Sequence, residues 1–320
     1  MVFAKCRVVA QAVSRLDELP GQSVEKTITK QGMRVLITGA SGFVGTSLVR
    51  SLREAGHKVI GLHRVAPEAS EGGEICIADL SCRFTRGLPE DHFDAVIHLA
   101  QSRWYREFPQ RANDIFSVNV ESTFRLLQWA KRVGVKKFIL ASTASLYDSR
   151  VPFHNESSSL VAETFYTASK LAAETLAKSY DSFFNVDILR FFTIYGPGQV
   201  GKLMPTIMSR IKAGEVITLQ GGEGLEFTPI YIDDVCKAIS SLLVDTSNNL
   251  ARVVNVCGDE HLSLKTAAAI IGEVLGREPT FIEQEGPQVH ITGCNHKLKS
   301  LVPLIEFTSF REGIVRCTSH

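Results

Sequence analysis

The chain has 320 residues, of which 44% are hydrophobic and 22% are charged, and its formal net charge is +1. This length allows about two domains and a sizeable core. The near-neutral charge gives no reason to expect a nucleic-acid partner or an anionic membrane surface, and no apolar run is long enough to span a bilayer. The seven cysteines show no CxxC spacing. We therefore expect a reduced, cytoplasmic protein with neither disulfides nor a metal site.

The first 32 residues are difficult to assign. Val2 to Leu16 shows some helical periodicity, but it lacks the long apolar core and the small-residue cleavage site of a signal peptide. Asp17, Glu18 and Glu25 argue against an organelle transit peptide. We interpret residues 1–32 as an N-terminal extension of unclear role, either an accessory helix or the product of an upstream start codon.

From residue 33 onward, strand and helix patterns alternate. Apolar runs typical of buried strands lie at 34–38, 58–62, 74–77, 94–99, 137–142 and 186–191. Helical patterns lie at 43–55, 112–133 and 164–181. A further strand is predicted at 253–257, and a helix follows at 263–275. The alternation predicts an α/β protein with right-handed βαβ units around a Rossmann-type, doubly wound parallel sheet.

A glycine-rich turn joins the first predicted strand to the first predicted helix. Gly39, Gly42 and Gly45 are spaced GxxGxxG rather than GxGxxG. Gly39 would permit a tight turn, Gly42 a close approach of the backbone to a pyrophosphate, and Gly45 close packing of helix on strand. The phosphates would then accept hydrogen bonds from N–H groups at the helix N-terminus. The pattern predicts a dinucleotide site, and the alternative is a glycine-rich turn without a ligand.

Tyr166 and Lys170 are four residues apart on one predicted helix, so their side chains share a face. An ammonium near a phenol stabilises the phenolate, and we therefore expect the pKa of Tyr166 to fall from about 10 toward neutrality. A phenol with such a pKa suits general acid–base catalysis near pH 7. Thr143 precedes this pair and places a hydroxyl at a strand end.

These motifs resemble the extended short-chain dehydrogenase/reductase family, in its branch of nucleotide-sugar epimerases, dehydratases and reductases. Further markers, in the same order, are Ala78-Asp79-Leu80, His98-Leu99-Ala100, Val118-Asn119, Tyr195-Gly196-Pro197-Gly198 and Ile230-Tyr231-Ile232-Asp233-Asp234-Val235. The resemblance implies an NAD(P)-binding Rossmann domain at 33–195, to which 229–257 return. A smaller C-terminal substrate domain would be formed by 196–228 and 258–320. The resemblance also implies a homodimer, built from the helices near 112–133 and 164–181.

The same resemblance implies roles for individual residues. Thr143 would bind the reacting substrate oxygen, Tyr166 would move the proton, and Lys170 would hold the nicotinamide ribose. The implied cofactor-binding residues are Gly39, Ser41, Gly42, Phe43, Val44, Gly45, His63, Arg64, Asp79, Leu80, Leu99, Ala100, Asn119, Tyr166 and Lys170.

The second predicted strand runs into His63 and Arg64, without the carboxylate that NAD-preferring relatives place there. A guanidinium can bind a 2′-phosphate with two hydrogen bonds, whereas a carboxylate would repel it. We therefore favour NADP over NAD. The alternative is that Arg64 stacks on adenine or points to solvent, and that the cofactor is NAD.

The substrate side departs from the family pattern. Thr193 replaces an asparagine that usually contacts the substrate diphosphate, and Glu226 stands where an arginine commonly neutralises it. A carboxylate facing a diphosphate would be costly unless a cation such as Lys202 or Arg210 intervened. The candidate substrate residues are Thr143, Thr193, Lys202 and Glu226.

The residues that follow Thr143 limit the reactions that this site could catalyse. Ala144 and Ser145 stand where dehydratases carry an Asp-Glu pair, which argues against loss of water. We predict an NAD(P)-dependent epimerase of a nucleotide-linked sugar, working by transient hydride transfer. An NADPH-dependent reductase of a keto sugar or another carbonyl compound is the main alternative. A catalytically silent dinucleotide-binding scaffold is the third.

Overall fold

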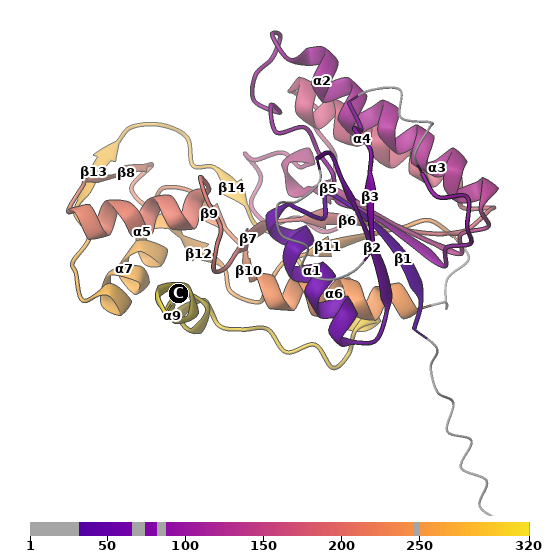
Figure 1. The fold of residues 1–320 in the computed structure, drawn as a ribbon. Coiled ribbons are helices and arrows are strands. Elements are labelled where there is room, and N and C mark those ends of the chain that lie inside the picture. The colour runs from indigo at the N-terminus through magenta and orange to yellow at the C-terminus, as the bar shows by residue number, and fades with distance from the viewer. Residues whose placement is uncertain (1–31, 66–73, 82–87, 246–249, 320) are drawn as a thin grey trace, which may run out of the picture. The chain divides into compact units, whose positions relative to one another are not determined.

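The computed structural model describes residues 32–65, 74–81, 88–245 and 250–319 (Figure 1). The extension predicted at 1–32 lies outside the described residues, apart from Gly32. Within the described ranges, no helix combines the length and the apolar character needed to cross a membrane.

A seven-stranded sheet has the strand order β11-β6-β5-β4-β1-β2-β3. Its strands are β1 (Arg34–Thr38), β2 (Lys58–His63), β3 (Ile75–Ile77), β4 (Ala95–His98), β5 (Lys137–Thr143), β6 (Asn185–Phe191) and β11 (Arg252–Val256). All neighbouring strands in this sheet are parallel. The predicted doubly wound parallel sheet is therefore confirmed. Chain order reverses at β1, which has β2 on one side and β4 on the other, and ligands bind at such switch points.

Helices cover both faces of the sheet (Figure 1). On one face α1 (Phe43–Glu54) packs beside α6 (Ile232–Val244), and on the other α3 (Ser122–Arg132) packs beside α4 (Phe165–Lys178). Each layer encloses its own apolar cluster. Leu48 and Ile239 belong to the cluster under α1 and α6, whereas Leu126 and Ala177 belong to the cluster under α3 and α4.

The helix predicted at 112–133 consists of three consecutive segments. These are α2 (Ala112–Phe116), a π-helical turn η1 (Ser117–Glu121) and α3. A π-helical turn inserts an extra residue into the helical register and often accompanies a functional site. Here it carries Asn119.

The remaining elements lie mostly after β6. The helices are α5 (Leu203–Ala213), α7 (Leu264–Leu275), α8 (His296–Leu301) and α9 (Phe310–Thr318). The strand pairs are β7 (Thr193–Tyr195) with β10 (Pro229–Tyr231), and β8 (Ile217–Gln220) with β13 (Phe281–Gln284). Between β12 (Leu262–Ser263) and β14 (His290–Ile291) lies β9 (Glu226–Phe227). The predicted division into a Rossmann and a substrate domain stays a prediction.

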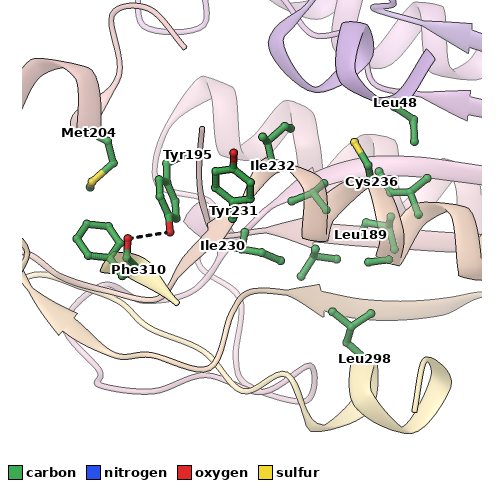
Figure 2. Packing of buried hydrophobic residues seen from close by; sticks show 14 of the residues in the cluster. Leu48, Leu189, Tyr195, Met204, Ile230, Tyr231, Ile232, Cys236, Leu298 and Phe310 are labelled. Atoms are coloured by element: carbon green, nitrogen blue, oxygen red, sulfur yellow. Dashed lines mark hydrogen bonds between the residues drawn. The ribbon is translucent and has the colours of Figure 1, made fainter. Parts of the chain in front are cut away.

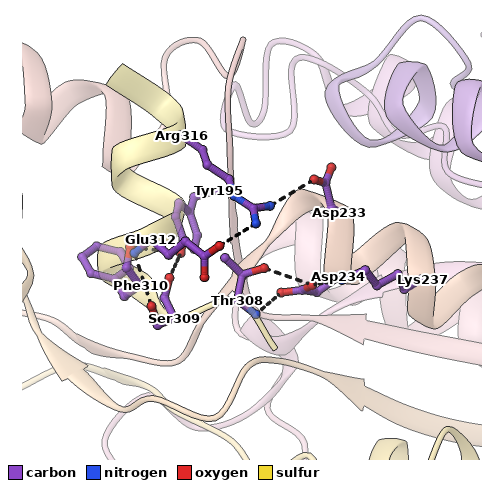
Figure 3. A network of polar contacts seen from close by, with 9 residues as sticks. All are labelled: Tyr195, Asp233, Asp234, Lys237, Thr308, Ser309, Phe310, Glu312 and Arg316. Carbon is purple, nitrogen blue, oxygen red and sulfur yellow. Dashed lines mark hydrogen bonds and ion pairs between the residues drawn. The ribbon is translucent and has the colours of Figure 1, made fainter. Parts of the chain in front are cut away.

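The apolar cluster under α1 and α6 continues into these elements (Figure 2). Tyr195 is buried there, and its hydroxyl lies 3.4 Å from the carbonyl oxygen of Phe310. Polar contacts then fix α9 against the start of α6 (Figure 3). The carboxylate of Asp234 accepts hydrogen bonds from the Thr308 N–H at 2.7 Å and from its hydroxyl at 3.2 Å. Asp234 lies in the first turn of α6, where a carboxylate also complements the helix dipole.

Candidate active site

A cavity of about 980 Å³ is lined by residues that follow the carboxyl ends of β1 to β6. Its volume lies at the upper end of the roughly 300–1,000 Å³ that is usual for ligand pockets. The cavity therefore occupies the edge of the sheet at which the strand order predicts a ligand.

The glycine-rich turn after β1 forms one wall of this cavity. Gly39 has a φ of 70°, and a Cβ added there would lie 2.8 Å from the backbone nitrogen of Ala100. A Cβ at Gly45 would lie 2.1 Å from the carbonyl oxygen of Gly39. Gly42 is the N-cap residue of α1, so the N–H groups of the first helical turn are left for a ligand. This cradle of backbone fits a dinucleotide pyrophosphate.

Thr143, Tyr166 and Lys170 line another part of the same cavity. Thr143 ends β5, and the other two lie in the first turns of α4. A reciprocal cap fixes the start of this helix. The Thr164 hydroxyl accepts a hydrogen bond from the Thr167 N–H at 3.1 Å, and the Thr167 hydroxyl accepts one from the Thr164 N–H at 3.0 Å.

Lys170 is buried, and its ammonium donates a hydrogen bond to the carbonyl oxygen of Ala141. Burial lowers the pKa of Lys170 to about 8, and the carboxylate of Glu174 opposes that shift. Burial also raises the pKa of Tyr166 to about 12, while a hydrogen bond with Thr143 acts in the other direction. The expected fall of the Tyr166 pKa toward neutrality is therefore wrong for this arrangement, because burial outweighs the stabilisation of the phenolate.

A buried ion pair lies one helical turn beyond Lys170. Arg190 donates to both carboxylate oxygens of Glu174, at 3.0 and 2.7 Å, and the Ser142 hydroxyl donates to the same carboxylate. Arg190 also donates to the Tyr147 hydroxyl at 2.9 Å. These bonds tie α4 to β5 and β6, so they fix the helix that carries Lys170 relative to the strand that ends at Thr143.

The glycine turn, the hydroxyl at the end of β5 and the Tyr–Lys pair thus surround one cavity. Residues 35–257 match the model of the NAD dependent epimerase/dehydratase family. The chain belongs to this family. Membership confirms the predicted resemblance and the interpretation of the chain as an NAD(P)-dependent enzyme.

Family relatives match this chain over most of its length. A probable UDP-glucuronate 4-epimerase of Rhizobium meliloti is 26% identical, with 89% of this chain and 95% of that protein covered. A dTDP-4-dehydro-6-deoxy-D-allose reductase of Streptomyces bikiniensis is also 26% identical, with 87% of this chain and 91% of the reductase covered. The solved UDP-glucuronic acid 4-epimerase of Bacillus cereus in complex with NAD has a TM-score of 0.76 and 22% identity, covering 89% and 97% of the two chains, and shows the shared fold.

Most of the residues that the family resemblance predicted for the cofactor line the cavity. They are Gly39, Ser41, Gly42, Phe43, Val44, Gly45, Arg64, Asp79, Leu80, Leu99, Ala100, Tyr166 and Lys170. Arg64 is exposed, and the Asp79 carboxylate accepts hydrogen bonds from the Ser81 N–H at 2.9 Å and the Ser81 hydroxyl at 2.8 Å.

The structure does not bring His63 or Asn119 into this lining, although both lie in its described part. Asn119 is buried, and both ends of its amide are engaged. Its Oδ1 accepts from the Ser102 N–H at 2.9 Å, and its Nδ2 donates to the Ser169 hydroxyl at 2.9 Å. Asn119 therefore holds the loop after β4 to α4, instead of reaching into the cavity as its predicted contact with the cofactor requires.

Of the substrate residues that the family resemblance predicted, some line the cavity and one does not. Thr193 and Lys202 line the cavity together with Thr143, whereas Glu226 is not part of the lining. The Glu226 carboxylate accepts a hydrogen bond from the Gln288 amide at 3.1 Å and lies 2.9 Å from Nδ1 of His290. Glu226 therefore lies outside the lining, with its carboxylate held by Gln288 and by His290 of β14, and its predicted contact with a diphosphate stays a prediction.

The loop between β4 and α2 also belongs to the site, although the sequence patterns did not predict it. Gln101, Arg103 and Arg106 line the cavity, and Gln101 accepts a hydrogen bond from the Tyr166 hydroxyl at 3.2 Å. One signal was available, since residues that follow the carboxyl end of a strand beside the switch point are expected near the ligand.

Proposed function

We propose that this protein is an NAD(P)-dependent 4-epimerase of a nucleotide-linked sugar. The observation that carries the proposal is that Thr143, Tyr166 and Lys170 line the same cavity as the glycine cradle. The epimerases and the keto-sugar reductase among the similar proteins support this class of substrate. Ala144 and Ser145, which follow Thr143, supply no acid–base pair for dehydration.

A bound nicotinamide dinucleotide supplies the carbon that accepts a hydride from the sugar and returns it. The Tyr166 phenolate takes the proton of the reacting sugar hydroxyl as the C–H bond breaks and so becomes the neutral phenol. The phenol returns that proton when the keto sugar is reduced from its other face. The Thr143 hydroxyl donates a hydrogen bond to the reacting oxygen. The overall reaction consumes no cofactor, because hydride and proton both return to the sugar.

The pKa values of the two groups on α4 support the roles proposed for them. With its pKa raised to about 12, Tyr166 is protonated at neutral pH and ready to donate to a keto oxygen. Removing a proton from an alcohol requires a nearby positive charge to stabilise the phenolate. Lys170, one helical turn away and still largely charged at pH 7 with a pKa of about 8, is the residue that supplies it.

The direct test is incubation of the purified protein with UDP-glucuronate and, separately, with UDP-glucose, without reductant. We expect the 4-epimer to accumulate until the two sugars reach equilibrium, as followed by proton NMR of the anomeric signals. Absence of any epimer, with cofactor bound and a broad panel of nucleotide sugars supplied, would contradict the proposal.

The second candidate is an NADPH-dependent reductase of a nucleotide-linked keto sugar. Arg64 favours it, because the side chain is exposed at the cavity after β2, where a 2′-phosphate would meet a guanidinium and no carboxylate. The spectrum of the purified protein separates the two candidates. Cofactor that stays bound through purification supports epimerisation, whereas cofactor that exchanges freely and is consumed with substrate supports reduction.

We also propose that the protein is a homodimer that contacts its copy through α2, α3 and α4. Phe116 of α2 and Phe124 of α3 are 51% and 43% exposed, and Phe108 in the loop before α2 is 56% exposed. Large exposed apolar side chains favour an interface. Phe116→Asp should convert a dimer into a monomer in analytical ultracentrifugation. A monomer mass for the unaltered protein at micromolar concentration would exclude this arrangement.

We propose a cytoplasmic location as well. Cys236, Cys257, Cys294 and Cys317, all in the described part of the chain, form no disulfide, as expected in a reducing compartment. Fractionation of cells, with detection of the protein in each fraction, tests this.

A further inference from the structure

Three cations enter the cavity from two segments near the catalytic tyrosine. Arg103 and Arg106 lie in the loop between β4 and α2, and Lys202 is the N-cap residue of α5. All three side chains are exposed. In the ranges that the structure describes, no carboxylate lies within ion-pair distance of any of the three. Their charges are thus available to a ligand.

Tyr105 connects these cations to the catalytic wall. Its hydroxyl accepts a hydrogen bond from the Lys202 ammonium at 3.0 Å, and the ammonium lies 4.9 Å from its ring centre. The ring of Tyr105 packs against that of Tyr166, with 5.0 Å between the ring centres. The cations that flank Tyr105 therefore lie beside the residue that handles the proton.

The loop that carries the two arginines is held at several points. The Ser102 N–H donates to Asn119, and the Ser102 hydroxyl donates to Asp114. Two guanidinium groups pack against the ring of Trp104, with 4.2 Å from its centre to Arg103 and 4.8 Å to Arg111. A loop fixed in this way is already arranged to bind, so less conformational entropy is lost when a ligand arrives.

The charges around the whole cavity are also unbalanced. Its lining contains the cations Arg64, Arg103, Arg106, Lys170 and Lys202 and the carboxylates Asp79 and Asp114. Both carboxylates already accept hydrogen bonds from serine residues. Arg64 follows β2, on the other side of β1 from the arginine loop, which follows β4. The excess positive charge beside Tyr166 is therefore separate from the cation on the β2 side.

We propose that Arg103, Arg106 and Lys202 bind the diphosphate of the nucleotide-linked substrate. This assignment rests on the proposed function and replaces the arginine that the family pattern places where this chain has Glu226. Guanidinium groups bind phosphate oxygens in bidentate geometry, and an ammonium adds a point charge. The Glu226 carboxylate contacts Gln288 and His290, so in this chain we assign diphosphate binding to Lys202 and to the loop that carries Arg103 and Arg106.

The test is the binding of UDP to the NADH-loaded protein, measured by isothermal titration calorimetry. Arg103→Gln and Arg106→Gln should each weaken UDP binding at least about tenfold, since hydrogen bonds to charged groups lie in that range. The affinity for uridine and for NADH should stay unchanged, and UDP binding should depend less steeply on salt. Arg210→Gln is the matched control, because Arg210 is exposed on α5 but is not part of the cavity lining.

Several outcomes would overturn the assignment. Unchanged UDP affinity in the double variant is one, and an equal loss of NADH affinity, which would assign the arginines to the cofactor, is another. The third such outcome is a loss of affinity for UDP-glucuronate without a loss of affinity for UDP or UDP-glucose, because the arginines would then bind the sugar carboxylate. Retained NADH binding shows that the variants are folded. If UDP binding depends on the arginines but no nucleotide sugar is epimerised, this assignment stands and the proposed function fails.

Discussion

The two walls of the cavity are built differently. The wall after β1 consists of backbone, because Gly39, Gly42 and Gly45 leave N–H groups and space where side chains would otherwise be. The second wall consists of side chains from β5, α4, the loop after β4 and the start of α5. A backbone wall accepts any dinucleotide pyrophosphate, whereas a wall of side chains selects one substrate and one reaction. Substitutions on each wall should therefore have different consequences.

The largest effect on stability is expected at Glu174, on the helix α4 that supports the side-chain wall. Glu174→Gln leaves the buried Arg190 guanidinium without a countercharge, and we expect a loss of about 3–5 kcal/mol in the free energy of unfolding. Urea denaturation followed by circular dichroism measures it. Glu163→Gln is the control, because its ion pair with Arg150 is at the surface, where solvent screens the charges, and its loss should leave the free energy of unfolding nearly unchanged. Equal stability of the two variants would show that the buried pair does not hold α4.

Tyr166→Phe tests whether the hydroxyl of Tyr166, on the side-chain wall, transfers the proton. Removing one hydroxyl keeps the ring packed against Tyr105, so fold and NADH affinity should be retained. Turnover should fall at least about 10²-fold, the usual scale for loss of a positioned proton donor. The comparison is made by NMR assay of epimer formation and by NADH fluorescence titration. Near-normal turnover in this variant would show that another group transfers the proton.

On the cofactor side, only Arg64 is expected to distinguish one dinucleotide from another. If Arg64 binds a 2′-phosphate, NADPH should bind about thirtyfold more tightly than NADH, and Arg64→Ala should remove most of that difference. Fluorescence titration with both dinucleotides provides the measurement. Equal affinities in the unaltered protein would support NAD, the dinucleotide in the similar solved structure.

The smallest effect concerns pH and Lys170, whose pKa burial lowers to about 8. Activity should fall as pH rises through this value, by about tenfold per pH unit, because the ammonium that stabilises the phenolate is lost. Stability should change in the opposite direction. Between the folded-state pKa and the ordinary value of 10.5 the unfolded chain binds more protons, so the free energy of unfolding rises with pH. Lys170→Met should flatten both profiles, and an inflection that persists would belong to another group.

What the sequence could predict depends on whether a residue's surroundings come from a local pattern or from distant segments of the chain. The glycine turn, the parallel strands and the Tyr–Lys pair each depend on a local pattern, so their positions were predicted from spacing alone. The surroundings of Asn119 could not be predicted in this way, because a π-helical turn changes the helical register there. The surroundings of Glu226 could not be predicted either, because its partner His290 lies 64 residues further along the chain. Residues whose surroundings are assembled from distant segments require the fold.

The core under α1 and α6 also has a consequence for synthesis. It joins Val35 in the first strand to Ile314 in α9, with Tyr195 and Phe310 packed between them. At about 5–20 residues per second, a ribosome needs roughly 15 to 60 seconds to make the chain between those two residues. During that time the first strand and α1 emerge with an apolar surface that only later segments will cover. In the nascent chain this surface stays uncovered until α9 leaves the exit tunnel, and ribosome stalling before Thr308 would leave it open to aggregation.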